Sequence, residues 1–234
     1  MRQILCTRSI DPALLDAAAK AGAGIRVSEF IRVETAVSPE GARVIEDLSA
    51  VAGAPVVFTS SHAVKAVAGR LETLQQQPCW QLYCISEVTA GVAARRFPRS
   101  TVSRAGAYAS EVARRIVEDG VTGEVWFFSG DRRRDTLGEA LTGAGLRVRE
   151  TVVYRTTLTP HAVPGFFDGI LFFSPSGVES YFSCNRPEPR TVLFAIGETT
   201  AGALRAASAN PVVVSPRQQA DALIGTMTDY FTRK

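Results

Sequence analysis

The sequence predicts an α/β protein built from two similar domains, each with a parallel sheet, joined by a two-stranded β connector. Short apolar runs of strand length alternate with segments that carry helix-start signals, which is typical of a parallel sheet covered on both faces. Three stretches of the first half return in the second half. The 46% hydrophobic and 21% charged residues form an ordinary globular composition, and 234 residues suffice for one domain or two.

The internal repeat favours two domains. Its pairs of segments keep the same order in each half: GAGIRV (22–27) with GAGLRV (143–148), VVFTSSHAV (56–64) with ILFFSPSGV (170–178), and LYCISEVTAGVA (82–93) with LFAIGETTAGAL (193–204). Three matches in register are hard to produce by chance. A period above roughly one hundred residues indicates a duplicated domain, since the repeats of a solenoid are far shorter.

Each copy contains four buried strands by this interpretation. In the first copy they are Ile4–Thr7, Val56–Thr59, Leu82–Ile85 and a short strand near Val102; in the second they are Val125–Phe128, Ile170–Phe173, Val192–Ala195 and Val212–Val214.

Helix signals follow the strands. Asp11 is an N-cap with Pro12 at the first helical position, and Gly22 ends that helix. Asp135 and Gly143 have the same roles in the second copy. Further helices are expected after Thr59 and Phe173, near Thr89 and Thr200, from about Ser110, and from Ser215-Pro216.

Two longer segments differ from these buried strands. Residues 29–37 (EFIRVETAV) and 149–158 (RETVVYRTTL) are rich in Val, Ile, Thr and Tyr with rough alternation, as half-exposed strands are. We expect them to pair as a connector, which predicts one domain from residues 1–35 with 157–234 and an inserted domain from 36–156. The competing layout is a tandem split near Gly123.

Composition excludes several classes of protein. No apolar run reaches the roughly 18 residues of a membrane span, and polar Thr7 and Arg8 come too early for the apolar region of a signal peptide. We therefore expect a cytoplasmic protein that does not bind membranes, and a monomer. Arginine supplies nearly all of the 26 basic residues, which fits an acidic ligand or a codon bias. Because no basic stripe with interleaved aromatics occurs, nucleic-acid binding is not expected.

The cysteines and histidines do not form a metal-binding pattern. A structural zinc site needs four convergent S or N ligands, and the available residues are scattered: Cys6, Cys79, Cys84, Cys184, His62 and His161. Free thiols in a reducing compartment are the expected state. Neither a nucleotide-binding loop nor a serine nucleophile elbow is present.

Small polar turns follow the predicted strands. Ligands of open α/β sheets bind beyond the carboxyl ends of the strands, where helix N-termini present backbone N–H groups. Helix capping explains any one of these turns, whereas the set favours an anion-binding cleft: Thr59-Ser60-Ser61, Thr89, Ser129-Gly130-Asp131, Ser174-Pro175-Ser176 and Thr199-Thr200.

An ordered set of motifs resembles the uroporphyrinogen-III synthase family. The set spans nearly the whole chain: TR at Thr7-Arg8, FTSSHAV, the two TA turns at Thr89 and Thr200, SGDRRRDTL, VVYRT, FFSPSGV and AIGETTAGAL. The resemblance implies two α/β domains joined by a two-stranded connector. It also implies a cofactor-independent lyase of heme biosynthesis, which dehydrates hydroxymethylbilane and closes it to uroporphyrinogen III with inversion of the last pyrrole ring.

The resemblance also implies roles for individual residues. Tyr154 of VVYRT would donate a proton to the departing hydroxyl, and its alternative is a half-buried strand tyrosine. The implied substrate-binding residues are Thr89, Thr200, Ser60, Ser174, Ser176, Thr199, Gly130 and Arg8.

The chain departs from the family pattern at three places. Ser86 and Glu198 stand where the two TA turns usually have Gly and Pro, and Ser129 replaces a common Arg before Gly130. A carboxylate at Glu198 would repel an anionic substrate unless it points away. The alternative function is a non-catalytic two-domain binder of a small anionic ligand.

Overall fold

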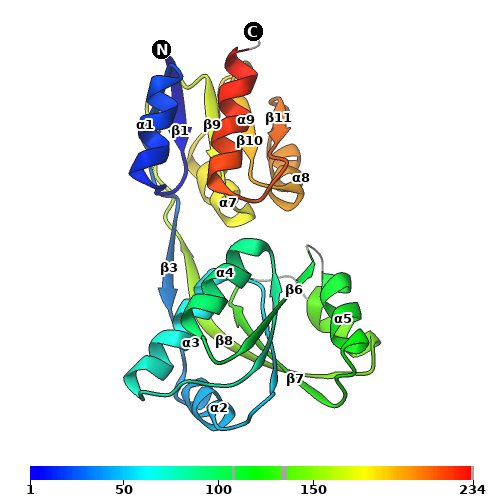
Figure 1. Ribbon diagram of the computed structural model, residues 1–234. Coiled ribbons are helices and arrows are strands. Elements are labelled where there is room, and N and C mark those ends of the chain that lie inside the picture. Colours follow the sequence, from blue (N-terminus) through cyan, green and yellow to red (C-terminus); the bar gives the residue numbers. More distant parts are fainter. Residues whose placement is uncertain (107–108, 133–135, 233–234) are drawn as a thin grey trace. The chain divides into compact units, whose positions relative to one another are not determined.

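The strands of the protein form two separate sheets. This computed structural model describes residues 1–106, 109–132 and 136–232. Its strands are β1 (Arg2–Cys6), β2 (Ala23–Val27), β3 (Ile31–Thr35), β4 (Pro55–Phe58), β5 (Gln81–Ile85), β6 (Thr101–Gly106), β7 (Glu124–Gly130), β8 (Arg147–Leu158), β9 (Gly169–Phe172), β10 (Val192–Ala195) and β11 (Val212–Val214). One sheet has the order β11-β10-β9-β1-β2 and the other β3-β8-β7-β4-β5-β6 (Figure 1).

Helices follow most of the strands. They are α1 (Pro12–Lys20), α2 (Pro39–Ser49), α3 (Ser61–Thr73), α4 (Glu87–Arg96), α5 (Ala109–Glu118), α6 (Thr136–Gly143), α7 (Pro175–Cys184), α8 (Glu198–Ala207) and α9 (Ala220–Thr232). Side chains cap several of them: Asp11 accepts from the N–H of Ala13 at α1, and Ser38 accepts from the N–H of Gly41 at α2. The expected cap at Asp135 lies outside the described residues.

The chain divides into two compact units. Unit 1 comprises residues 1–32 with 157–234, and unit 2 comprises residues 33–156. β1 lies in the sheet of unit 1, whereas β4 lies in the sheet of unit 2. β3 and β8 carry the chain between the units, and they are neighbours in the six-stranded sheet. The N–H of Ala36 donates to the carbonyl of Val153, and that of Thr159 donates to Phe30, so the two strands run antiparallel.

The two sheets share one topology. β1 pairs in parallel with β2 and β9 in unit 1, as β7 pairs with β8 and β4 in unit 2. The last strands of each copy extend the sheets in the same order, β10 and β11 in unit 1 and β5 and β6 in unit 2. Unit 1 has the 2-1-3-4-5 strand order of a doubly wound domain, and five strands of unit 2 occupy the equivalent positions, although the chain enters them at β4 and β3 extends the sheet beside β8.

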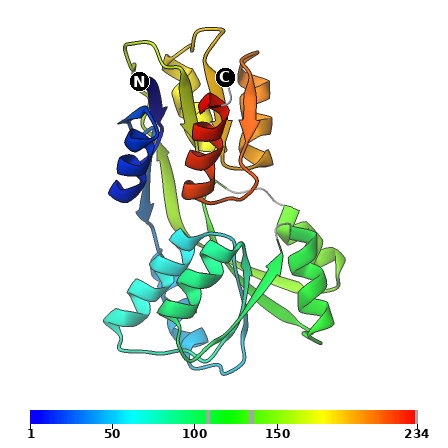
Figure 2. The same cartoon turned by 45° about the horizontal axis from the view of Figure 1, so that its top comes forward.

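Each sheet is covered on both faces. In unit 1, α1 and α9 pack on one face and α7 and α8 on the other (Figure 2). In unit 2, α2, α3 and α4 pack on one face and α5 and α6 on the other. Fully buried side chains of the central strands fill these layers, among them Leu5, Phe58, Phe128 and Phe194. Burial of each such side chain contributes about 1.5–3 kcal/mol.

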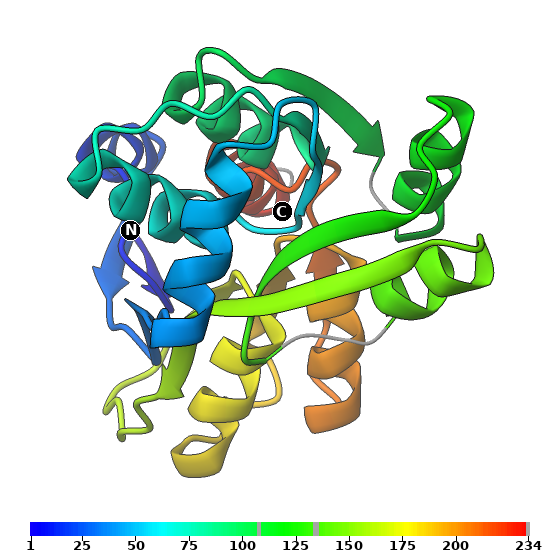
Figure 3. The same ribbon diagram turned by 90° about the horizontal axis from the view of Figure 1, so that it is seen from below.

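The structure differs from expectation at particular elements. GAGIRV forms the separate strand β2, whereas Arg147 and Val148 of GAGLRV begin the long strand β8 (Figure 3). α4 and α8 begin two residues before their TA turns, at Glu87 and Glu198. α9 begins at Ala220 rather than at Ser215-Pro216, because the hydroxyl of Ser215 donates to the carbonyl of Arg217 and forms a turn.

Candidate active site

The sheet of unit 1 presents a cation where its strand order reverses. In a 2-1-3-4-5 sheet this switch point lies at the carboxyl ends of the two central strands, here β1 and β9. Thr7 follows β1 and is buried, and its hydroxyl donates to the carbonyl of Leu171 at 2.8 Å. Arg8 is exposed, and its guanidinium carbon lies 4.3 Å from the centre of the Phe173 ring. A cation–π contact of this kind holds the guanidinium at the sheet edge.

The serines that follow Phe173 lie at the start of α7. Ser174 is the N-cap, and its hydroxyl oxygen accepts from the N–H of Gly177 at 3.1 Å. Ser176 is half-buried in the same turn. The hydroxyl of Ser174 therefore caps the helix, and its proton remains able to donate to an acceptor outside it.

The start of α8 is capped differently. Gly197 is its N-cap residue and has no side chain to accept from the first turn. Thr199 is exposed and Thr200 is buried, with the N–H of Thr200 bonded to the carbonyl of Gly197 at 3.1 Å. The N–H groups at such a terminus attract anions. Glu198 pairs with Arg205, seven residues along the helix, at 3.2 Å, which directs its carboxylate away from the N-terminus.

The sheet of unit 2 presents a phenol at the equivalent switch point, between β4 and β7. Tyr154 lies on β8 and pairs in register with Gly130 at the end of β7. Its ring lies directly over Gly130, since a Cβ built there would be 2.7 Å from the phenol oxygen. The ring of His62, in the first turn of α3, has its centre 5.7 Å from that of Tyr154. Ser60 caps the same turn by accepting from the N–H of His62 at 3.1 Å.

The TA turn of unit 2 begins with an unusual backbone conformation. Ser86 is the N-cap of α4 and has a φ of 75°, in the left-handed region. Its hydroxyl oxygen accepts from the N–H of Thr89 at 3.3 Å and lies 3.2 Å from the hydroxyl of Thr89. Thr89 is buried. The usual Gly of the family pattern is explained by this φ, because glycine adopts it without steric cost.

The structure thus distributes the candidate residues over two sheet edges. Arg8, Ser174, Ser176, Thr199 and Thr200 belong to unit 1, and Ser60, Thr89, Gly130 and Tyr154 belong to unit 2. Sequence reasoning missed Phe173 under Arg8 and His62 beside Tyr154. The signal was present in both cases, because each residue belongs to a repeated motif that contains a central strand and the turn that follows it.

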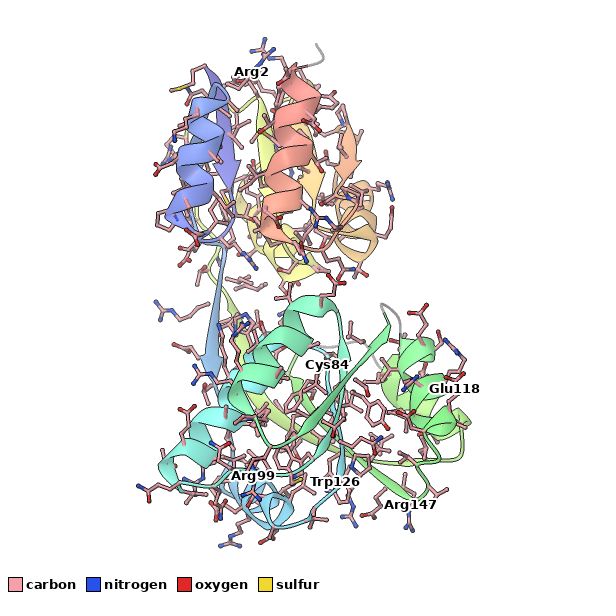
Figure 4. The ribbon with its side chains drawn as sticks, viewed as in Figure 1. Arg2, Cys84, Arg99, Glu118, Trp126 and Arg147 are labelled. Atoms are coloured by element: carbon pink, nitrogen blue, oxygen red, sulfur yellow. The ribbon has the colours of Figure 1, made fainter. Side chains whose placement is uncertain are left out.

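The cysteines fall into two classes. Cys6 and Cys84 are buried free thiols, whereas Cys79 and Cys184 are exposed. Burial raises the pKa of Cys6 to about 11 and that of Cys84 to about 12. Figure 4 labels Cys84 on β5 and Trp126 on β7 in unit 2.

Among the residues that the structure describes, no three His, Cys, Asp or Glu side chains are grouped so as to hold a metal ion. In the same part of the chain, no helix is long and apolar enough to cross a membrane.

Three solved structures that share this fold are described as uroporphyrinogen-III synthases or synthetases. Over 98% of this chain and 100% of the other, the fold matches the uroporphyrinogen-III synthetase of Helicobacter pylori with a TM-score of 0.69 and 16% identity. A mutant uroporphyrinogen III synthase of Thermus thermophilus matches over 100% of both chains with a TM-score of 0.70 and 16% identity. The wild-type Thermus enzyme in another crystal form gives 0.53, also with 16% identity, over 100% of this chain and 99% of that one. These matches confirm the α/β fold.

Comparison at the level of sequence identifies the family. No curated protein sequence matches the chain. The family model described as uroporphyrinogen-III synthase HemD matches residues 13–225, which is most of the chain. The protein therefore belongs to the uroporphyrinogen-III synthase family, the cyclising lyases of heme biosynthesis.

Proposed function

We propose that this enzyme binds hydroxymethylbilane at the carboxyl-end edges of its two sheets and that Tyr154 protonates the departing hydroxyl. In the family's reaction, the terminal hydroxymethyl group loses its oxygen as water and the linear tetrapyrrole closes to a ring with the last pyrrole inverted. The proton on the phenol of Tyr154 allows water, rather than hydroxide, to leave. The carbocation that remains is stabilised by the adjoining pyrrole nitrogen. Attack by a pyrrole carbon closes the ring, and the proton that this carbon then loses restores the phenol.

The acetate and propionate arms of the substrate are anions, and each sheet edge offers groups that bind anions. In unit 1 these are the guanidinium of Arg8, the hydroxyls of Ser174 and Ser176, and the N-terminus of α8 with Thr199 and Thr200. In unit 2 they are Ser60 at α3 and Thr89 at α4, both at helix N-termini. Within the described part of the chain, no carboxylate pairs with Arg8, which supports its assignment to the substrate.

Glu198 does not oppose this assignment. Its carboxylate is paired with Arg205 on the side of α8. The N–H groups of the first turn of α8 carry the positive end of the helix dipole, which attracts an anionic arm. The departure from the usual Pro is therefore compatible with a binding role for this turn.

The observation that carries the proton-donor role is the placement of one phenol at a switch point. Tyr154 is half-buried, and its ring is fixed over Gly130 with the ring of His62 beside it. The O–H of a phenol can donate its proton to a departing hydroxyl as a general acid. Catalysis by positioning accounts for the rest, because binding the arms decides which carbon closes the ring.

We also propose that the enzyme acts as a monomer in the cytoplasm. The free state of all four cysteines, two of them exposed, supports a reducing compartment. Sedimentation analysis at working concentration tests the oligomeric state.

The experiment that tests the function supplies hydroxymethylbilane to purified enzyme in the presence of a chelator and identifies the isomers formed. Unaided closure gives the symmetric type I isomer, so formation of type III is the readout. We expect type III to predominate without added metal or nucleotide. Recovery of type I alone, or turnover only after a metal is restored, contradicts the proposal.

A further inference from the structure

The main chain on the C-terminal side of Tyr154 is held by Asp131, the residue that follows β7. A register shift between Ser129 and Gly130 places Gly130 opposite Tyr154. The N–H of Asp131 then donates to the carbonyl of Tyr154 at 3.1 Å. The side chain of Asp131 turns back, and its Oδ1 accepts from the N–H of Thr156 at 2.9 Å. Asp131 thus forms a hydrogen bond to Tyr154 through its backbone N–H and a second one to Thr156 through its carboxylate.

These bonds extend the pairing of β7 and β8 beyond the register shift. A bulge leaves the ladder locally disrupted unless another group restores the lost bonds. The carboxylate of Asp131 does so, and it lies 3.7 Å from Nε of Arg155 as well. The peptide units on the C-terminal side of Tyr154 are consequently fixed to the end of β7.

Gly130 fixes the side chain in turn. A Cβ at this position would lie 2.7 Å from the phenol oxygen and nearer still to Cζ and Cε2 of the ring. No side chain other than hydrogen fits beneath the ring, so the aromatic face covers the glycine of the neighbouring strand. The ring of His62 lies near the same phenol, 5.7 Å between centres.

We propose that Gly130 and Asp131 are the positioning residues of the cyclisation, which set the phenol of Tyr154 at the height and angle from which it delivers its proton. This inference rests on the proposed function, in which Tyr154 is the donor. Asp131 fixes the backbone from which the phenol projects, and Gly130 sets how close the ring lies to the sheet. A displacement of about 1 Å at a reacting group is enough to lower a rate about a hundredfold.

The test is a set of double-mutant cycles on the rate of type III formation. Asp131→Ala removes the acceptor for the N–H of Thr156, whereas Asp131→Asn retains an oxygen at that place. Gly130→Ala forces the ring of Tyr154 to move. Each change is made in the wild type and in Tyr154→Phe, with kcat and KM measured separately and circular dichroism taken for each variant. The matched control is Asp168→Ala in unit 1, where Oδ2 accepts from the N–H of Gln3 at 2.8 Å.

We expect Asp131→Ala and Gly130→Ala to lower kcat by roughly ten- to a hundredfold with little change in KM. Asp131→Asn retains most of the rate, and the control keeps the wild-type kcat. In the Tyr154→Phe background, Asp131→Ala and Gly130→Ala cause no further loss, because the group they position is already absent.

The outcomes separate this inference from the function on which it rests. Full activity of Tyr154→Phe removes the donor role and the inference with it. A slow Tyr154→Phe with a wild-type rate in both positioning variants overturns the inference alone. The inference alone is also overturned if Gly130→Ala or Asp131→Ala lowers the rate as much in Tyr154→Phe as in the wild type. That result would mean that Gly130 or Asp131 acts on the substrate directly. If Asp131→Ala does not fold, the Gly130→Ala cycle and the kcat of Asp131→Asn decide the question.

Discussion

The hydroxyl of Ser86 lies 3.2 Å from the hydroxyl of Thr89, and this contact spans a backbone that has a φ of 75° at Ser86. A residue with a Cβ is strained in this region by roughly 1–2 kcal/mol, which glycine avoids. Ser86 offsets part of that strain, because its hydroxyl caps α4 by accepting from the N–H of Thr89. Compared with the family's usual Gly, Ser86 is therefore strained in its backbone but supplies a side-chain cap to α4.

Replacement of Ser86 separates these two contributions. Ser86→Gly relieves the strain, and glycine as the N-cap residue costs only a few tenths of a kcal/mol relative to serine. We therefore expect the free energy of unfolding of unit 2 to rise by about 1 kcal/mol. Ser86→Ala keeps the strain and loses the cap, so we expect a loss of about 1 kcal/mol. Urea unfolding followed by tryptophan fluorescence measures both, since Trp80 and Trp126 lie in unit 2. Equal midpoints for the two variants would contradict this account.

The hydroxyls of Thr89 and Thr200 are expected to contribute less to the rate than Tyr154. Both threonines are buried, so valine preserves their shape and removes only the hydroxyl. We expect Thr89→Val and Thr200→Val each to slow type III formation by the value of one hydrogen bond to a charged group, roughly 1.5–3 kcal/mol. The control is Thr191→Val, whose buried hydroxyl bonds the carbonyl of Phe167 at the amino end of β10. If Thr191→Val slows type III formation as much as Thr89→Val and Thr200→Val do, the losses come from removing a buried hydroxyl and not from a lost contact with the substrate.

The buried thiol of Cys84 makes unit 2 less stable in alkali. Burial raises the pKa of Cys84 from 9.0 to about 12, so the unfolded chain releases a proton that the folded chain retains. The free energy of unfolding therefore falls as the pH rises from about 9 towards 12. Below pH 9 the thiol is protonated in both states, and the folded protein keeps its full stability in this respect. We expect the urea midpoint to fall less between pH 8 and pH 10.5 in Cys84→Ala than in the wild type. Cys79→Ala, which removes an exposed thiol, should show the wild-type dependence.

Unit 2 is expected to fold without unit 1. Residues 33–156 contain a complete sheet with helices on both faces, and their two ends come from the adjacent strands β3 and β8. We expect a protein of these residues alone to unfold cooperatively in urea, with the emission of Trp80 shifted to the blue because that side chain is buried. Emission like that of the urea-unfolded chain at every urea concentration would contradict this expectation.

Strong local signals explain what the sequence predicted of the fold. β10 and β11 have the predicted bounds, because turn residues border their continuous apolar runs. α1 begins at Pro12 after the cap at Asp11, as local capping chemistry requires. β2 was missed because Ala23–Val27 directly follows the glycine that ends α1 and has no turn signal of its own. Its pairing with β1 is a tertiary contact that no local pattern encodes.

The sequence predicted which residues belong to the candidate site, but it did not predict the contacts between them. Motif order located Tyr154 and Gly130, and strand ends located the serines at helix N-termini. The stacking of Tyr154 on Gly130 depends on a one-residue register shift between β7 and β8, with Val153 of β8 as the extra residue, which period-two alternation does not reveal. The bond from Thr156 to Asp131 is likewise a consequence of that shift.

The measurement that tests the central claim most directly is the initial rate of type III formation by Tyr154→Phe. The change removes one oxygen from a ring that rests on Gly130, so circular dichroism should match that of the wild type. We expect the rate to fall by about 10²–10⁴-fold, the usual range for loss of a general acid, and by more than in any other single polar variant. A rate equal to that of the wild type would contradict the donor role of Tyr154.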